Sequence, residues 1–124
     1  VNLRATMVVT REALPLLRES NGQIVTLASI AGTIPTPGLA VYGATKAALI
    51  ALTNSLNREE ADNGVRATAI CPAFVATKMT DWTGLPGEEM IQVEDVAELV
   101  RTVLKLSPRA RVPQIVIERV GDVV

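Results

Sequence analysis

The stretch GQIVTLASIAGTIPTPGLAVYGATK, residues 22–46, decides the fold of this 124-residue chain. It starts with a short apolar run at Gln23–Ala28, which is typical of a central parallel strand covered on both faces. A loop rich in glycine and proline follows, and it leads into a helix that carries Tyr42 and Lys46. A strand that passes through a loop into a helix predicts an α/β fold.

Tyr42 is the only tyrosine of the chain, and Lys46 is one of only three lysines. Residues four apart on a helix share a face, with their Cβ atoms about 5–6 Å apart. An ammonium beside a phenol favours the phenolate, so this pair suits proton transfer. The alternative interpretation is an ordinary tyrosine and a solvated lysine near the start of a helix.

Two further polar residues stand upstream of this pair. Ser29 ends the apolar run thirteen residues before Tyr42, and Asn2 lies another twenty-seven residues upstream. Ligands of open α/β sheets bind beyond the carboxyl ends of the strands, which is where Ser29 is expected. The alternatives are a loop serine that bonds its own backbone and an asparagine that caps a helix.

Asn2, Ser29 and Tyr42-x-x-x-Lys46 together resemble the signature of the short-chain dehydrogenase/reductase family. The resemblance implies a Rossmann-like, three-layer αβα fold with a parallel sheet, and residues 1–124 would form a single, partial domain of it. This C-terminal portion would hold about three strands and three main helices. The N-terminal dinucleotide-binding half, with its glycine-rich phosphate loop, would be absent from this chain.

The same resemblance implies an NAD(P)-dependent oxidoreductase that interconverts a carbonyl and an alcohol on a small-molecule substrate, with NADP or NAD as the cofactor. Tyr42 would act as general acid and base, and Lys46 would hold the nicotinamide ribose and stabilise the tyrosinate. Ser29 would bind the substrate oxygen together with Tyr42, and Asn2 would anchor a water path to solvent. The competing hypotheses are a non-catalytic oligomerisation module and an inactive reductase fragment.

The segment Pro72–Thr77 resembles the family's Pro-Gly segment, which holds the nicotinamide carboxamide. By that match Pro72, Val75 and Thr77 would bind the cofactor, Val75 through its main chain and Thr77 through its hydroxyl. Ala73 replaces the family's glycine, at a cost of about 1 kcal/mol if its φ is positive. Residues 78–92 read as irregular and correspond to the family's substrate lid, whose apolar members are Met79, Trp82 and Leu85.

The remaining chain reads as alternating helices and strands. A strand–helix–strand unit favours parallel pairing with a right-handed crossover. Pro15 is expected to bend or shorten the last turn of the first helix. The expected helices are 1–19, 42–63 and 93–107, and the expected further strands are 65–71 and 114–118. In the strand 65–71, Val65, Ala67, Ala69 and Cys71 alternate along the chain and the end is apolar.

The resemblance also implies a homo-dimer or homo-tetramer, assembled through the helices 1–19 and 42–63. Small residues on the second helix would allow close approach, although they could equally serve packing within one subunit: Ala44, Ala47, Ala48 and Ala51. Asn63-Gly64 predicts the stop of this helix. Four charged residues predict that its end is solvated: Arg58, Glu59, Glu60 and Asp62. The strand at Gln23–Ala28 is expected to keep one edge unpaired.

The amino-acid composition argues against several classes of binding and catalytic site. The net charge of −1 gives no argument for binding nucleic acid or an anionic membrane. Without histidine and with one cysteine, the chain can build neither a His/Cys zinc site nor a Ser-His-Asp triad. Cys71 excludes an intrachain disulfide, reads as a small buried residue and fits a reducing, cytoplasmic compartment. No apolar run is long enough to predict a membrane span.

Overall fold

The structure, a computed structural model, describes residues 2–122. Predictions that include Val1, at the start of the first helix, and Val123 and Val124, in the tail, lie outside the described residues. The main elements follow the expected order: α1 (Asn2–Ser20), β1 (Gln23–Leu27), α2 (Ala40–Glu59), β2 (Arg66–Pro72), α3 (Val93–Lys105) and β3 (Gln114–Ile117).

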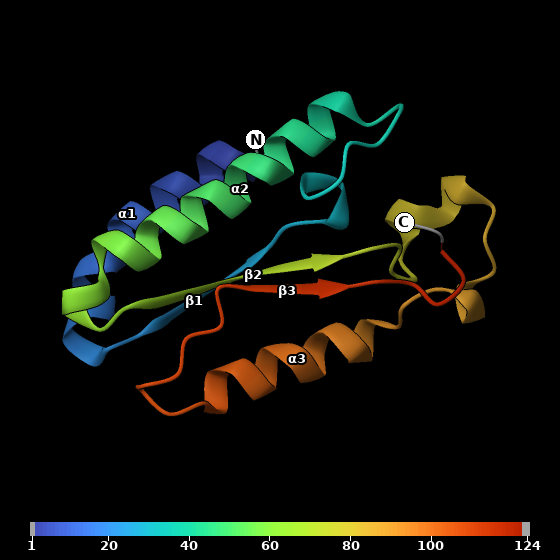
Figure 1. Ribbon diagram of the computed structural model, residues 1–124. Coiled ribbons are helices and arrows are strands. Elements are labelled where there is room, and N and C mark those ends of the chain that lie inside the picture. Colours follow the sequence, from blue (N-terminus) through green and yellow to red (C-terminus); the bar gives the residue numbers. More distant parts are fainter. Residues whose placement is uncertain (1, 123–124) are drawn as a thin grey trace.

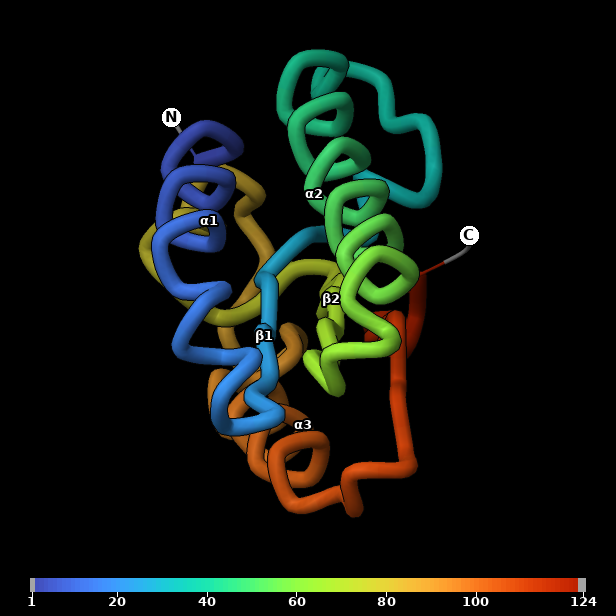
Figure 2. Tube along the Cα trace, turned by 90° about the vertical axis from the view of Figure 1, so that its left-hand side faces the viewer, coloured from blue at the N-terminus to red at the C-terminus, as the bar shows by residue number. Residues whose placement is uncertain are grey.

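The strands form one parallel sheet in the order β1-β2-β3. Helices α1 and α2 cover one face of this sheet and α3 covers the other (Figure 1). Figure 2 shows α1 on the β1 side and α2 on the β2 side of the same layer. The Rossmann-like, three-layer arrangement predicted from the sequence is therefore confirmed.

The core lies along β2, the middle strand. Ala69, Ile70 and Cys71 are fully inaccessible to solvent, and burial runs without a break from Ala67 to Cys71. The residues between the alternating Ala67, Ala69 and Cys71 are thus buried as well, because helices cover both faces of this strand. Leu49 of α2 packs against the α1–α2 side of this strand.

Strand β1 is less enclosed than the sequence predicted. Within the described residues it pairs with β2 alone, and the Leu27 side chain is 56% exposed. The prediction of a strand covered on both faces is therefore wrong at Leu27, whereas Ala28, the last residue of the predicted strand, is buried. The expectation of an unpaired edge holds for the part of the chain that the structure describes.

Helix α1 runs through Pro15 and ends at Ser20, so, of the predicted bending or shortening of its last turn, the shortening does not occur. Proline lacks one main-chain N–H and therefore removes only one hydrogen bond from the helix. The turn that ends the helix lies after Ser20, beyond Pro15. Asn21 adopts a left-handed conformation with φ of 50°, and the Gly22 N–H donates to the Leu17 carbonyl at 2.8 Å. Asn21 and Gly22 thus form the turn that closes the C-terminal end of α1.

Helix α2 ends at Glu59, four residues before the predicted end, and a 3₁₀ turn over Ala61–Asn63 continues the chain. Gly64 then stops it with φ of 74°. The buried Asn57 amide joins α2 to β2: its Nδ2 donates to the Ala67 carbonyl at 2.8 Å, and its Oδ1 accepts from the Ala67 N–H at 2.7 Å. Asn57 thus satisfies both main-chain groups of a buried strand residue.

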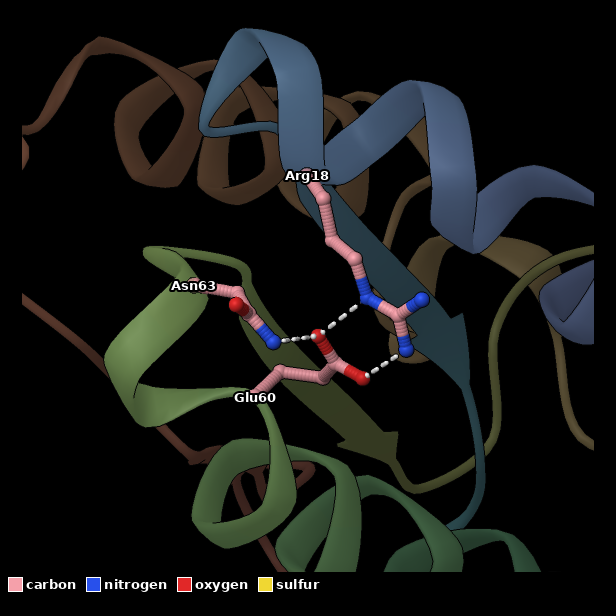
Figure 3. Close-up of polar contacts among 3 residues, drawn as sticks. All are labelled: Arg18, Glu60 and Asn63. Atoms are coloured by element: carbon pink, nitrogen blue, oxygen red, sulfur yellow. Dashed lines mark hydrogen bonds and ion pairs between the residues drawn. The ribbon is translucent and has the colours of Figure 1, made fainter.

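Glu60 is 4% exposed, so the prediction of a fully solvated helix end is wrong at this position. Arg18 of α1 donates to both Glu60 carboxylate oxygens, at 2.9 and 2.6 Å, and Asn63 Nδ2 donates to one of them at 2.9 Å (Figure 3). The hydrogen bonds from Arg18 and then Asn63 lower the pKa of Glu60 to about 2. This carboxylate therefore ties the end of α1 to the end of α2.

The segment 78–92, predicted to be irregular, contains two short 3₁₀ helices, η3 (Lys78–Thr83) and η4 (Gly87–Glu89). Its two ends are joined, since the Ala76 N–H donates to the Ile91 carbonyl at 2.9 Å and the Ile91 N–H donates to the Phe74 carbonyl at 3.0 Å. Trp82 is 69% exposed and meets the Phe74 ring edge-on at 6.0 Å. Among residues 2–122, no helix combines the length and apolar character needed to cross a membrane.

Candidate active site

Ser29 lies where the sequence places it, at the carboxyl edge of the sheet just after β1. Its backbone is extended, with φ of −164° and ψ of 154°, and it caps the 3₁₀ helix η1 (Ile30–Gly32). The Ser29 Oγ accepts a hydrogen bond from the Ala31 N–H at 3.1 Å, and the residue is 7% exposed. This bond is the one expected under the alternative interpretation, that of a loop serine that bonds its own backbone. Because the hydroxyl oxygen is the acceptor in this bond, the hydroxyl proton can still be donated to another group.

Two glycines let the loop after β1 lie directly on α2. A Cβ added to Gly32 would lie 2.8 Å from the Ala47 nitrogen, and one added to Gly43 would lie 2.9 Å from the Ala31 carbonyl oxygen. A real side chain at either position would push η1 and α2 apart. Gly32 and Gly43 flank the Gly/Pro loop, but the residue pattern alone does not reveal that they are contact positions.

Tyr42 and Lys46 share a face of α2, as their spacing predicted. Lys46 Nζ lies over the Tyr42 ring, 5.5 Å from its centroid, and donates to the Leu27 carbonyl at 3.1 Å. Burial lowers the pKa of the Lys46 ammonium below its ordinary value. Lys46 is therefore not freely solvated, because it is half-buried and bonded to the last residue of β1, two residues before Ser29.

Asn2 is the first residue of α1 and is exposed. Its carbonyl accepts from the Thr6 hydroxyl at 2.7 Å. Asn2 and Lys46 both line a cavity of about 500 Å³ between α1, β1 and α2. Ser29 and Tyr42 are not among the residues that line it, so the cavity joins only two of the four predicted catalytic residues.

The chain after β2 holds the predicted cofactor residues Pro72, Val75 and Thr77 at the carboxyl edge of the sheet. Asn21 is the only non-glycine residue with positive φ among those described, so Ala73 carries no strain of that kind. The Val75 carbonyl accepts from the Thr80 hydroxyl at 2.7 Å, a partner that the sequence did not reveal. Thr77 is exposed, and its hydroxyl offers both a donor and an acceptor.

Cys71 is buried, as predicted, and is a free thiol. Burial raises the pKa of the Cys71 thiol, which disfavours the nucleophilic thiolate. Within residues 2–122, no three acidic, cysteine or histidine side chains are grouped to hold a metal ion.

The chain resembles known proteins over nearly its whole length. Among curated relatives, an uncharacterized oxidoreductase of Staphylococcus epidermidis is 40% identical over 121 residues, covering 97% of this chain and 53% of the relative. A betaketoacyl-ACP reductase of Bacteroides thetaiotaomicron superposes with a TM-score of 0.80 at 32% identity, covering 97% of this chain and 50% of that structure. The chain thus spans about half the length of these proteins.

Two further solved structures carry nicotinamide cofactors. A serine dehydrogenase complexed with NADP⁺ superposes with a TM-score of 0.81 at 29% identity, covering 94% of this chain and 52% of that structure. A 4-hydroxyisoleucine dehydrogenase complexed with NADH superposes with a TM-score of 0.81 at 27% identity, covering 96% and 55%. The family model for short-chain dehydrogenases matches residues 1–84. The chain therefore belongs to the short-chain dehydrogenase family.

Proposed function

We propose that this protein is an NAD(P)-dependent oxidoreductase that interconverts a carbonyl and an alcohol, with Tyr42 as the general acid and base. The observation that carries the proposal is the position of Lys46, whose ammonium lies over the Tyr42 ring and bonds the Leu27 carbonyl, two residues before Ser29. This arrangement puts a phenol and a cation beside the strand end where ligands of α/β sheets bind.

Tyr42, Lys46 and Ser29 would each have a separate role in the reaction at the substrate oxygen. Tyr42 gives its proton to the carbonyl oxygen in the reducing direction and takes it back in the oxidising direction. The Lys46 ammonium stabilises the tyrosinate that remains. Ser29 donates its hydroxyl proton to the same oxygen and so stabilises the negative charge that develops there.

The residues at the carboxyl edge fit the nicotinamide end of NAD(P). The exposed Thr77 hydroxyl can donate a hydrogen bond to a carboxamide and accept one from it. The backbone at Ala73, which precedes these residues, has no positive φ and so carries no strain of that kind. When bound, the cofactor supplies or accepts the hydride. Lys46 would hold the nicotinamide ribose, while Pro72 and Val75 would shape the carboxamide site. Asn2, which shares a cavity with Lys46, would hold water that connects the ammonium to solvent.

A fluorescence titration of the protein with NADPH and with NADH tests the cofactor part of the proposal. We expect saturable binding of at least one of them. We expect weaker binding by Lys46→Met and unchanged binding by Lys105→Met, whose lysine lies in the last turn of α3. No binding by the wild-type protein at millimolar concentrations would favour a non-catalytic oligomerisation module or an inactive fragment.

We further propose a homo-dimer or homo-tetramer that uses α1 and α2. On α2, Val41 is 82% exposed, and on α1 Val9 and Leu16 are 66% and 68% exposed. Burial of such side chains between subunits would be favourable. Light scattering of the wild-type protein and of Val41→Glu tests this, because a charge placed in the interface should reduce the mass to that of a smaller species. A monomeric wild-type protein would contradict it.

A further inference from the structure

A second cavity of about 310 Å³ lies between the C-terminal end of α2 and the chain that leads into β3, lined by Asn54, Asn57, Arg58, Arg111 and Pro113. In Figure 1 these two segments lie at the end of the sheet opposite to η1, which follows Ser29. The cavity is therefore at the amino edge of the sheet, away from Tyr42 and Lys46.

The polar residues that line this cavity are two arginines and two asparagines. The two arginines are Arg58 and Arg111, and no acidic residue lines the cavity. Neither arginine takes part in an ion pair within residues 2–122. Two like charges at one cavity repel one another, and an anion between them would relieve that repulsion.

Arg111 is held in place by the protein. Its Nη1 donates to the Asn57 main-chain carbonyl at 3.1 Å. Asn57 is 3% exposed and is itself fixed to Ala67 by the two amide hydrogen bonds described above. One nitrogen of the guanidinium therefore positions the group, while its remaining N–H groups can serve as donors.

The turn that presents Arg111 is also fixed. The Ala110 N–H donates to the Ser107 carbonyl at 3.0 Å, and Arg66 Nη1 donates to the carbonyls of Ser107 and Ala110 at 2.7 and 2.8 Å. Preorganised donors bind a ligand with little loss of conformational entropy.

We propose that this cavity is a binding site for a small phosphate-bearing anion, held by Arg58 and Arg111 with the Asn54 amide as a further donor. The planar guanidinium matches phosphate oxygens in a bidentate manner, and its charge strengthens each hydrogen bond. The site does not rest on the proposed oxidoreductase activity, because none of its residues belongs to the candidate active site.

Inorganic phosphate is the probe for this site. We expect phosphate to raise the thermal midpoint of the wild-type protein more than chloride does at equal ionic strength, along a saturable curve. Arg58→Gln and Arg111→Gln should each weaken phosphate binding by about tenfold, the loss of one charge-assisted contact. Arg101→Gln is the matched control, since Arg101 is an exposed arginine on α3, paired with Glu98.

Two results would overturn the proposal. One is a phosphate effect no larger than that of chloride, which would show ionic strength alone. The other is an equal phosphate effect in wild type, Arg58→Gln and Arg111→Gln, which would place the anion elsewhere. Since all three substituted arginines are exposed, the variants are expected to fold, and circular dichroism checks this before titration.

Discussion

The Lys46 ammonium donates a hydrogen bond to the Leu27 carbonyl oxygen across 3.1 Å, which ties α2 to the last residue of β1. Ser29 follows Leu27 by two residues, so this bond fixes the strand end relative to the helix that carries Tyr42. The ammonium is partly withdrawn from water by this packing, and its pKa is lowered as a result. The geometry of the candidate site thus depends on how closely the loop after β1 lies on α2.

Gly32→Ala tests that close approach. The new Cβ would lie 2.8 Å from the Ala47 nitrogen, a main-chain atom that cannot rotate away. We expect a loss of about 1–3 kcal/mol in the free energy of unfolding, as for other overpacked sites, together with reduced turnover. Gly87→Ala is the control, because nothing lies within 4 Å of its added Cβ. Equal stability of the two variants, measured by urea unfolding, would contradict the close packing.

Asn57→Ala should be strongly destabilising. It leaves the buried N–H and C=O groups of Ala67 without their partners, and each such group costs about 1–3 kcal/mol. The exposed neighbour Asn54→Ala should change the free energy of unfolding by no more than about 0.5 kcal/mol. Urea unfolding of both variants compares them, and a small effect of Asn57→Ala would refute the role of this amide in joining α2 to β2.

Glu60 makes stability depend on pH in the acid range. Its pKa falls from the ordinary 4.5 to about 2 in the folded protein, so the folded state favours the ionised carboxylate. The stabilisation is therefore complete above the unfolded pKa and is lost as the pH falls from about 5 to about 2. Glu60→Gln should be less stable than wild type at neutral pH, and the gap should close over that range.

Denaturant midpoints at a series of pH values measure this gap for Glu60→Gln, with the exposed Glu59→Gln as the control. A gap that stays constant from neutral pH to pH 2 would show that the Arg18–Glu60 contact has no influence on the titration of this carboxylate.

Cys71 should be inert in the folded protein. The side chain is fully inaccessible to solvent, so an added reagent cannot reach it. Burial also raises the pKa of the thiol, which lowers the fraction of the reactive thiolate. A disulfide reagent such as Ellman's should modify it only after unfolding in guanidinium chloride. Rapid modification of one thiol in buffer would contradict the burial described for the end of β2.

The parts of the fold that follow hydrophobic pattern could be predicted from the sequence. The apolar run of β1 specifies a strand, and the Tyr42–Lys46 spacing specifies a shared helical face. The apolar residues of α3 recur at helical spacing and specify a helix: Val96, Leu99, Val100, Val103 and Leu104. What could not be predicted are contacts between distant residues. Glu60 reads as a surface charge until Arg18, forty-two residues upstream, is seen against it. In the same way, the importance of Gly32 depends on the position of Ala47.

The central claim is that Tyr42 moves the proton of the reaction, and its most direct test is turnover by Tyr42→Phe. NADPH and NADH oxidation are measured with a panel of aldehydes and ketones, with Thr45→Val on the same helix as the control variant. We predict that wild type and Thr45→Val reduce the same substrate, and that Tyr42→Phe binds cofactor equally well but is slower by a factor of about 10² to 10⁴. Turnover by Tyr42→Phe at the wild-type rate would contradict the account.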